Sequence, residues 1–134
     1  MPTRYLLDTN MASYVIRGSM PRVRERMRMI PMAQISVSTV TEAELRFGLA
    51  RRPEATQLKI AVEEFLLRAA PVPWDSDAAR QYALLRADLE RAGAPMGNLD
   101  MMIGAHALAA EAVLVTNDHS FRRLKHLKIE DWTK

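Results

Sequence analysis

Short apolar segments alternate with segments of helical spacing along this chain of 134 residues. We expect the apolar segments to be strands at residues 4–7, 34–37, 70–74 and 112–115, with a weaker one at 127–129. Strands that alternate with helices form parallel sheets joined by right-handed crossovers. The pattern therefore predicts a single domain over residues 1–134, folded as a three-layer α/β/α sandwich around a parallel sheet of four to five strands.

Capping and stop signals mark the helices between these strands. The residues that begin or end them are Gly18 after the first, Pro21 and Pro31 around the second, Ser38 or Thr39 before the third, Pro53 before the fourth, Asp75 and Gly93 around the fifth and Gly97-Asn98 before the sixth. Thr39 and Glu42 have the spacing of a capping box. Pro71 and Pro73 indicate that the 70–74 strand lies at the sheet edge, because proline cannot donate to a central ladder.

The composition is that of a globular protein, with 49% hydrophobic and 26% charged residues. There is no cysteine, which excludes disulfides, thiolate metal sites and a cysteine nucleophile, and fits a cytoplasmic location. An apolar strand follows residues 1–4 directly, so we expect no signal peptide, and no apolar run is long enough to span a membrane. The net charge is +3, with basic clusters at residues 22–28, 51–52 and 122–128. Such clusters are either solvated helix faces or contacts to phosphates or an acidic partner.

Four acidic residues lie where a strand or a small-residue signal gives way to a helix: Asp8, Glu44, Asp100 and Asp118. The carboxyl ends of parallel strands share one edge of the sheet, and ligands bind there. At about 5 Å and an effective dielectric near 20, each pair of carboxylates would repel by roughly 3 kcal/mol. Such a group needs cations, and oxygen ligands select hard ones such as Mg²⁺ or Mn²⁺.

Each acid also has an ordinary structural interpretation. Asp8 is either a metal ligand or the N-cap of the helix that follows it, and Asp100 would complement the dipole of its own helix. Thr116-Asn117-Asp118 has the composition of a simple turn. Glu42 lies on a different helix face from Glu44 and is interpreted as a surface partner of Arg46.

The ordered motifs resemble the PIN domain, and the C-terminal tail resembles that of VapC toxins. The segments that carry the resemblance are Leu6-Leu7-Asp8-Thr9-Asn10, Ser38 to Gly48, Gly97-Asn98-Leu99-Asp100 to Ala107, Thr116-Asn117-Asp118 to Phe121, and Ile129-Glu130-Asp131-Trp132. The resemblance implies a metal-dependent endoribonuclease in which Asp8, Glu44, Asp100 and Asp118 hold one or two Mg²⁺ or Mn²⁺ ions. Some relatives carry a further acid where this chain has Ser120, which leaves the second ion in question.

Further polar residues are candidates for support or for substrate contact. Thr116 and Ser38 would orient a carboxylate or a metal-bound water, and Asn10 would either fix Asp8 or cap its helix. Arg86 and Arg91 are candidates for RNA contact, although a solvated helix face is the better interpretation. His119 adjoins Asp118 and would reach a phosphate.

The resemblance also implies partners. They are a cognate VapB-type antitoxin, a structured RNA with transfer RNA first among the candidates, a second copy of the chain with contacts near Met27, Met29 and Ile30, and operator DNA reached through the antitoxin. Two alternatives remain open: a non-catalytic co-repressor that binds DNA only with its antitoxin, and a DNA-directed nuclease. The carboxylates alone do not distinguish RNA from DNA.

Overall fold

The computed structural model describes residues 2–134; Met1, which belongs to the domain predicted from the sequence, lies outside the described residues. Five parallel strands form one sheet in the order β3-β2-β1-β4-β5. The strands are β1 (Tyr5–Leu7), β2 (Ile35–Ser38), β3 (Pro71–Val72), β4 (Val113–Val115) and β5 (Ile129–Glu130). The predicted parallel α/β fold is confirmed, and the proline-containing strand lies at the edge, as Pro71 and Pro73 indicated.

Six α-helices connect the strands. They are α1 (Thr9–Arg17), α2 (Pro21–Arg28), α3 (Thr39–Ala50), α4 (Thr56–Arg68), α5 (Ser76–Arg91) and α6 (Asn98–Ala109), with short 3₁₀ helices η1 (Met32–Gln34) and η2 (His119–Arg123). Gly18 ends α1 with φ 65°, a left-handed conformation that glycine adopts without a Cβ clash. Asp75 caps α5 by accepting a hydrogen bond from the Ala78 N–H, as predicted.

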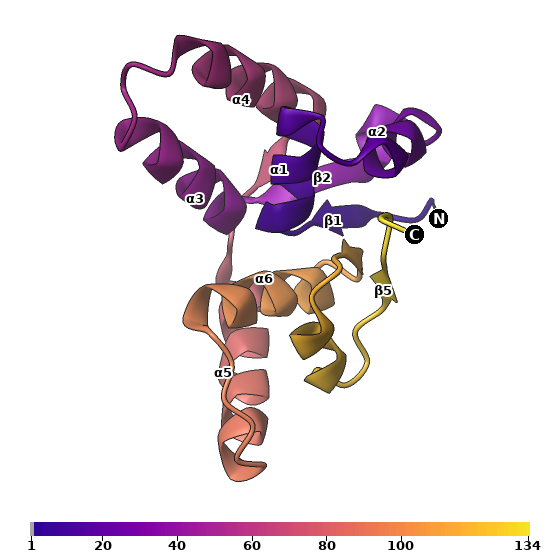
Figure 1. The fold of residues 1–134 in the computed structure, drawn as a ribbon. Helices are drawn as coiled ribbons and strands as arrows, with labels where there is room; N and C mark the ends of the chain where they lie inside the picture. Colours follow the sequence, from indigo (N-terminus) through magenta and orange to yellow (C-terminus); the bar gives the residue numbers. More distant parts are fainter. Residues whose placement is uncertain (1) are drawn as a thin grey trace.

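The sheet separates two apolar cores, because successive strand residues face opposite sides. On β1, Leu7 packs with residues of α1, α2 and α4, whereas Leu6 packs with residues of α5 and α6. Figure 1 shows α1 to α4 above the strands and α5 and α6 below them. Both residues are fully buried, as expected for a central strand covered on both faces. This three-layer arrangement fixes β1 and its carboxyl end at the centre of the molecule.

Several local predictions were wrong. Helix α4 begins at Thr56 and not at Pro53, because residues 52–55 form a turn. Ser38 is the N-cap of α3, so Thr39 makes no capping box, and its hydroxyl accepts instead from the Trp74 N–H at 3.1 Å. The last strand lies at 129–130 and not at 127–129. Met27 is 2% exposed within the core and does not belong to a contact surface, unlike Met29, which is 76% exposed.

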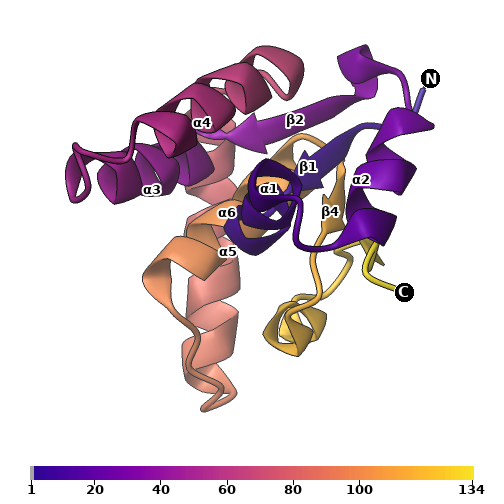
Figure 2. The same ribbon diagram turned by 45° about the horizontal axis from the view of Figure 1, so that its top comes forward.

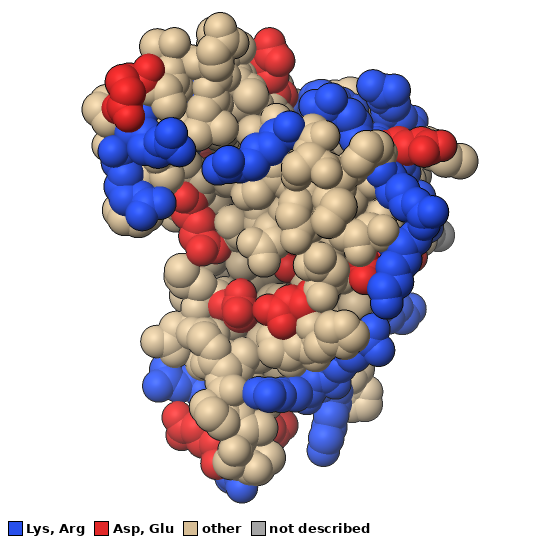
Figure 3. Space-filling view, viewed as in Figure 1, with Lys and Arg blue, Asp and Glu red and all other residues tan. Residues whose placement is uncertain are grey.

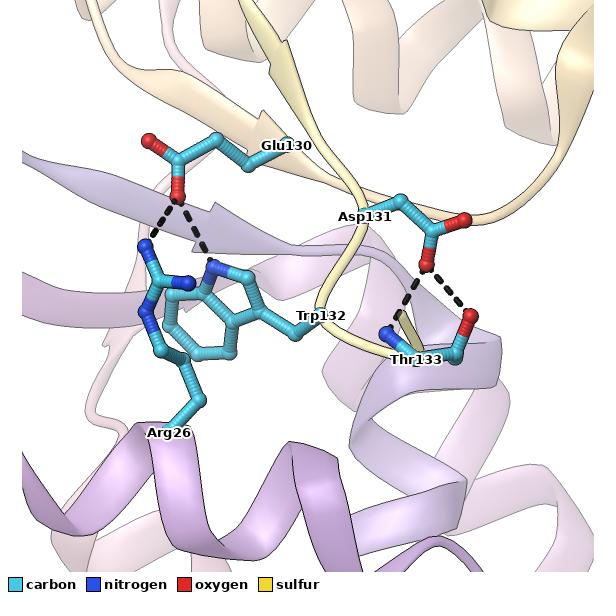
Figure 4. A network of polar contacts seen from close by, with 5 residues as sticks. All are labelled: Arg26, Glu130, Asp131, Trp132 and Thr133. Atoms are coloured by element: carbon cyan, nitrogen blue, oxygen red, sulfur yellow. Dashed lines mark hydrogen bonds and ion pairs between the residues drawn. The ribbon is translucent and has the colours of Figure 1, made fainter.

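The C-terminal tail is held against β1 and α2 around the buried side chain of Trp132 (Figure 4). The Trp132 indole N–H donates to Glu130 Oε1 at 2.9 Å, and Arg26 of α2 forms an ion pair with the same oxygen at 3.2 Å. The Tyr5 and Trp132 rings lie 5.4 Å apart. Apolar burial of the indole therefore anchors the tail, with the ion pair at its surface.

We expect Arg26→Ala to lower the free energy of unfolding by less than about 1 kcal/mol, because exposed ion pairs contribute little in water. The Arg26 side chain is 48% exposed, and the Glu130 carboxylate keeps its bond to Trp132 when Arg26 is removed. Urea denaturation of the two proteins measures the difference. A loss several times larger would mean that the ion pair, and not the indole, holds the tail.

No helix among residues 2–134 is both long enough and apolar enough to cross a membrane.

Candidate functional site

The four acids named above lie around the carboxyl ends of the central strands, and we refer to Asp8, Glu44, Asp100 and Asp118 as the acidic cluster. Asp8 follows β1 directly, and Asp118 lies three residues beyond β4, which pairs with β1. Glu44 lies on α3, the helix that follows β2, and Asp100 lies in the first turn of α6. Figure 2 shows β1 and β2 running the same way toward the ends where α1 and α3 begin. Figure 3 shows acidic side chains gathered in a hollow of one face, with Lys and Arg side chains beside it.

Asp8 is a buried carboxylate with two fixed hydrogen bonds. It is 4% exposed and caps α1, where its Oδ1 accepts from the Met11 N–H at 2.8 Å. Its Oδ2 accepts from the Thr116 hydroxyl at 2.5 Å. The N-cap interpretation is therefore confirmed for Asp8. It does not exclude metal binding, because each carboxylate oxygen has a second lone pair.

Thr116 links the two carboxylates that follow β1 and β4. The residue is buried; its hydroxyl donates to Asp8 and accepts from the Asp118 N–H at 3.0 Å. Asp118 caps η2, and its Oδ1 accepts from the Ser120 N–H at 2.9 Å. Thr116 thus lies where the sequence analysis placed a supporting residue, between a strand end and two carboxylates.

Burial and mutual repulsion both act on this cluster. Burial raises the pKa of Asp8 to about 6, the hydrogen bonds from Thr116 and Met11 oppose the rise, and the charges of Asp100 and Asp118 add to it. The pKa of Asp100 is also raised, first by burial and then by the charges of Asp118 and Glu44. These interactions tie all four acids into one electrostatic unit that resists carrying its full negative charge.

Glu44 is held by Thr9, which in turn contacts Thr41, and the sequence analysis singled out neither threonine as functional. The Thr9 hydroxyl donates to Glu44 Oε1 at 2.6 Å and lies 3.2 Å from the hydroxyl oxygen of Thr41. Thr9 was quoted only as part of the motif after β1. The available signal was its place directly after Asp8, at the first position of α1.

The chemistry of these side chains suits a hard divalent cation, because they offer only carboxylate and hydroxyl oxygens as ligands. The carboxylates also repel one another, and a cation would relieve that repulsion. Within residues 2–134, no three His, Cys, Asp or Glu side chains stand close enough as placed to share one metal ion. The assignment of each carboxylate as a metal ligand therefore stays a prediction.

The other supporting candidates are Ser38 and Asn10. Ser38 is buried, and its hydroxyl oxygen accepts from the Val40 N–H and lies 2.7 Å from His106 Nδ1, so it joins α3 to α6 and has no hydrogen bond to the acidic cluster. Burial lowers the pKa of His106, which favours the neutral ring. Asn10 is exposed within α1, and Asp8 rather than Asn10 is the cap.

The candidate substrate contacts lie on exposed helices. Arg86 donates to the Tyr82 hydroxyl at 2.8 Å and to Glu90 at 3.3 Å, and Arg91 pairs with Asp88 at 2.8 Å, all within α5. These pairs agree with the solvated-face interpretation. His119 is exposed at the start of η2, beside Asp118 in the chain.

Comparison with known proteins gives matches over almost the whole chain. The model of the PIN domain matches residues 5–127. The tRNA(fMet)-specific endonuclease VapC of Salmonella typhimurium is 32% identical over 130 residues, which covers 96% of this chain and 98% of that protein. The ribonuclease VapC2 of Rickettsia felis is 31% identical over 132 residues, covering 97% and 98%.

Solved structures match equally well. The VapBC complex of Salmonella typhimurium bound to DNA contains a chain with a TM-score of 0.90 and 32% identity, covering 98% of this chain and 99% of that one. VapBC2 of Rickettsia felis, bound to a DNA fragment from its promoter, gives a TM-score of 0.89 at 29% identity, covering 96% and 98%. The chain therefore belongs to the PIN domain family and, within it, to the VapC ribonucleases.

Proposed function

We propose that this chain is an endoribonuclease toxin that depends on Mg²⁺ or Mn²⁺, cleaves structured RNA, transfer RNA first among the candidates, and is neutralised by a VapB-type antitoxin. The observation that carries the proposal is the acidic cluster at the carboxyl edge of the sheet, with Asp8 buried and its pKa raised to about 6. Burying a carboxylate beside two others costs free energy, and a bound cation would offset that cost.

The proposed chemistry is hydrolysis of a phosphodiester. A bound Mg²⁺ or Mn²⁺ supplies Lewis acidity and makes water a nucleophile at neutral pH, so no protein nucleophile is needed. The acidic cluster would hold one or two such ions. Thr116 keeps Asp8 and the backbone of Asp118 in a fixed relation. Basic side chains beside the hollow in Figure 3 would bind the phosphate backbone outside the point of cleavage.

The relatives support the proposed substrate class and partners. One is named as a tRNA(fMet)-specific endonuclease, and the two solved structures described above are VapBC complexes bound to DNA. By analogy we propose a cognate antitoxin, a homodimer of this chain, and a larger complex that reaches operator DNA through the antitoxin. Arg86, Arg91 and His119 remain proposed RNA contacts that lie outside the acidic cluster.

The test is cleavage by the purified chain. We expect it to cut transfer RNA when Mg²⁺ or Mn²⁺ is present, to stop when EDTA is added, and to resume when Mg²⁺ is restored. Single-stranded and duplex DNA of matched length are run beside the RNA, and gel analysis with end labels locates the cut.

Each alternative has its own outcome in this experiment. Cleavage of DNA in preference to RNA would identify a DNA-directed nuclease. Absence of cleavage of every substrate, by a folded protein that still binds operator DNA together with the antitoxin, would identify the co-repressor. Cleavage that persists in EDTA would contradict the role of the metal.

A further inference from the structure

We infer that Thr9 is a positioning residue, with Thr41 behind it, that holds the Glu44 carboxylate in place for the cation. This inference rests on the proposed function and assigns a role to two hydroxyl groups in it. Neither hydroxyl belongs to the acidic cluster, and both come from elements that meet only in the folded chain.

The contact joins two helices that follow neighbouring strands. Thr9 is the first residue of α1, after β1, and Glu44 lies on α3, after β2. The Thr9 hydroxyl lies 2.6 Å from Glu44 Oε1, the short distance expected when a hydroxyl donates to a charged carboxylate. Thr9 therefore contacts Glu44 from the same strand–helix junction at which Asp8 caps α1.

Because each hydroxyl has a single proton, the direction of the two hydrogen bonds among Thr41, Thr9 and Glu44 can be deduced. A hydroxyl carries a single proton, so Thr9, which donates to Glu44, has only lone pairs to offer Thr41. The 3.2 Å contact between the two hydroxyl oxygens is then made by the proton of Thr41. Thr41 is fully buried, so its hydroxyl has no water to turn toward. The chain of donation runs from Thr41 to Thr9 to Glu44.

This order of donation matters because electrostatic repulsion acts on the Glu44 carboxylate. Its charge acts on Asp100, and the side chain of a glutamate has three rotatable bonds, so repulsion would otherwise turn it outward. A donor at one oxygen holds the carboxylate while leaving its other oxygen available. Hydrogen bonds behind a metal ligand change metal affinity by about 10- to 100-fold in known sites.

The test measures Mn²⁺ binding by isothermal titration calorimetry, with thermal unfolding in EDTA as a second readout. Thr9→Val keeps the shape and removes the hydroxyl, and we expect it to weaken Mn²⁺ binding by about 10-fold. Thr9→Ser restores the hydroxyl and is expected to restore the affinity. Thr41→Val should weaken binding less, because it acts through Thr9.

Thr133→Val is the matched control. The Thr133 hydroxyl also donates to a carboxylate, that of Asp131, which lies outside the acidic cluster. The Thr133→Val protein should bind Mn²⁺ with the affinity of the wild type. A cleavage assay gives an independent reading, since activity of Thr9→Val should recover as Mn²⁺ is raised toward saturation.

The outcomes separate the two proposals. If the wild type binds Mn²⁺ and a folded Thr9→Val binds it equally well, the positioning role is overturned and the proposed nuclease stands. A lower melting temperature of Thr9→Val in EDTA with unchanged affinity also overturns it, because the contact would then serve the fold alone. If the wild type itself binds no Mn²⁺, the proposed function fails, and the role of Thr9 fails with it.

Discussion

Asp100→Asn is expected to lower RNA cleavage at least about 100-fold, at the upper end of what losses around metal sites cause. The substitution keeps the size of the side chain and removes one charge from the acidic cluster. Burial and the charges of Asp118 and Glu44 already raise the pKa of Asp100, so its charge is unfavourable in the metal-free protein. The fold should therefore survive, and the metal-free variant should be no less stable than the wild type.

Initial cleavage rates at saturating Mg²⁺, together with urea denaturation in EDTA, test this prediction. Asp77→Asn is the matched control, because it removes one charge from an exposed position of α5, where Asp77 pairs with Arg80. The control should cleave at the wild-type rate. A well-folded Asp100→Asn protein with full activity would remove Asp100 from the site.

The architecture was predictable because a strand that is buried on both faces has a nearly continuous apolar sequence. The run Ala112 to Val115 is apolar throughout, and β4 lies next to the centre of the sheet. The cap at Asp75 and the stop at Gly18 were equally clear, since each depends on a single residue with a strong conformational preference. The position of the acidic cluster followed from the rule that parallel strands end at one edge.

The error at Thr39 has a physical cause in the tertiary structure. Both Pro53 and Thr39 carry the right chemistry for a helix start, but at Thr39 a tertiary contact decides between neighbouring candidates. The Thr39 hydroxyl bonds to the backbone of Trp74, 35 residues away, which leaves the cap to Ser38. Thr9 and Thr41 were missed as positioning residues for the same reason. Their contact spans 32 residues, and a threonine carries no sign of which distant carboxylate it meets.

Asp8 illustrates a different limit of sequence reasoning. Cap and ligand were weighed as alternatives, yet a carboxylate at the junction of β1 and α1 can satisfy the helix terminus and still face Asp100 and Asp118. The two roles have different consequences for stability, because the cap needs only an acceptor whereas the cluster responds to charge. A substitution that keeps the acceptor and removes the charge separates them.

Asp8→Asn is that substitution, and we expect it to change how stability depends on pH. The pKa of Asp8 is raised to about 6 in the folded chain, above its ordinary value of 3.8. The folded state therefore binds more protons than the unfolded state between these values, and stability falls as the pH rises through this window. In EDTA, the Asp8 contribution should lower the free energy of unfolding of the wild type by about 2 kcal/mol between pH 4 and pH 7.

The variant should lack this loss while keeping the cap, because an Asn amide oxygen can accept from the Met11 N–H as the carboxylate does. The difference between the two proteins reports Asp8 together with its coupling to Asp100 and Asp118, because the lowered pKa of His106 acts in the opposite direction and is common to both. Asp77→Asn, made at an exposed position of α5 where Asp77 pairs with Arg80, should retain the wild-type slope. Urea denaturation in EDTA at several pH values gives the three curves. Parallel curves for the wild type and Asp8→Asn would show that Asp8 serves only as the cap of α1. Curves that converge at low pH and separate at neutral pH would establish that the buried Asp8 charge destabilises the fold, a cost that a bound cation would offset.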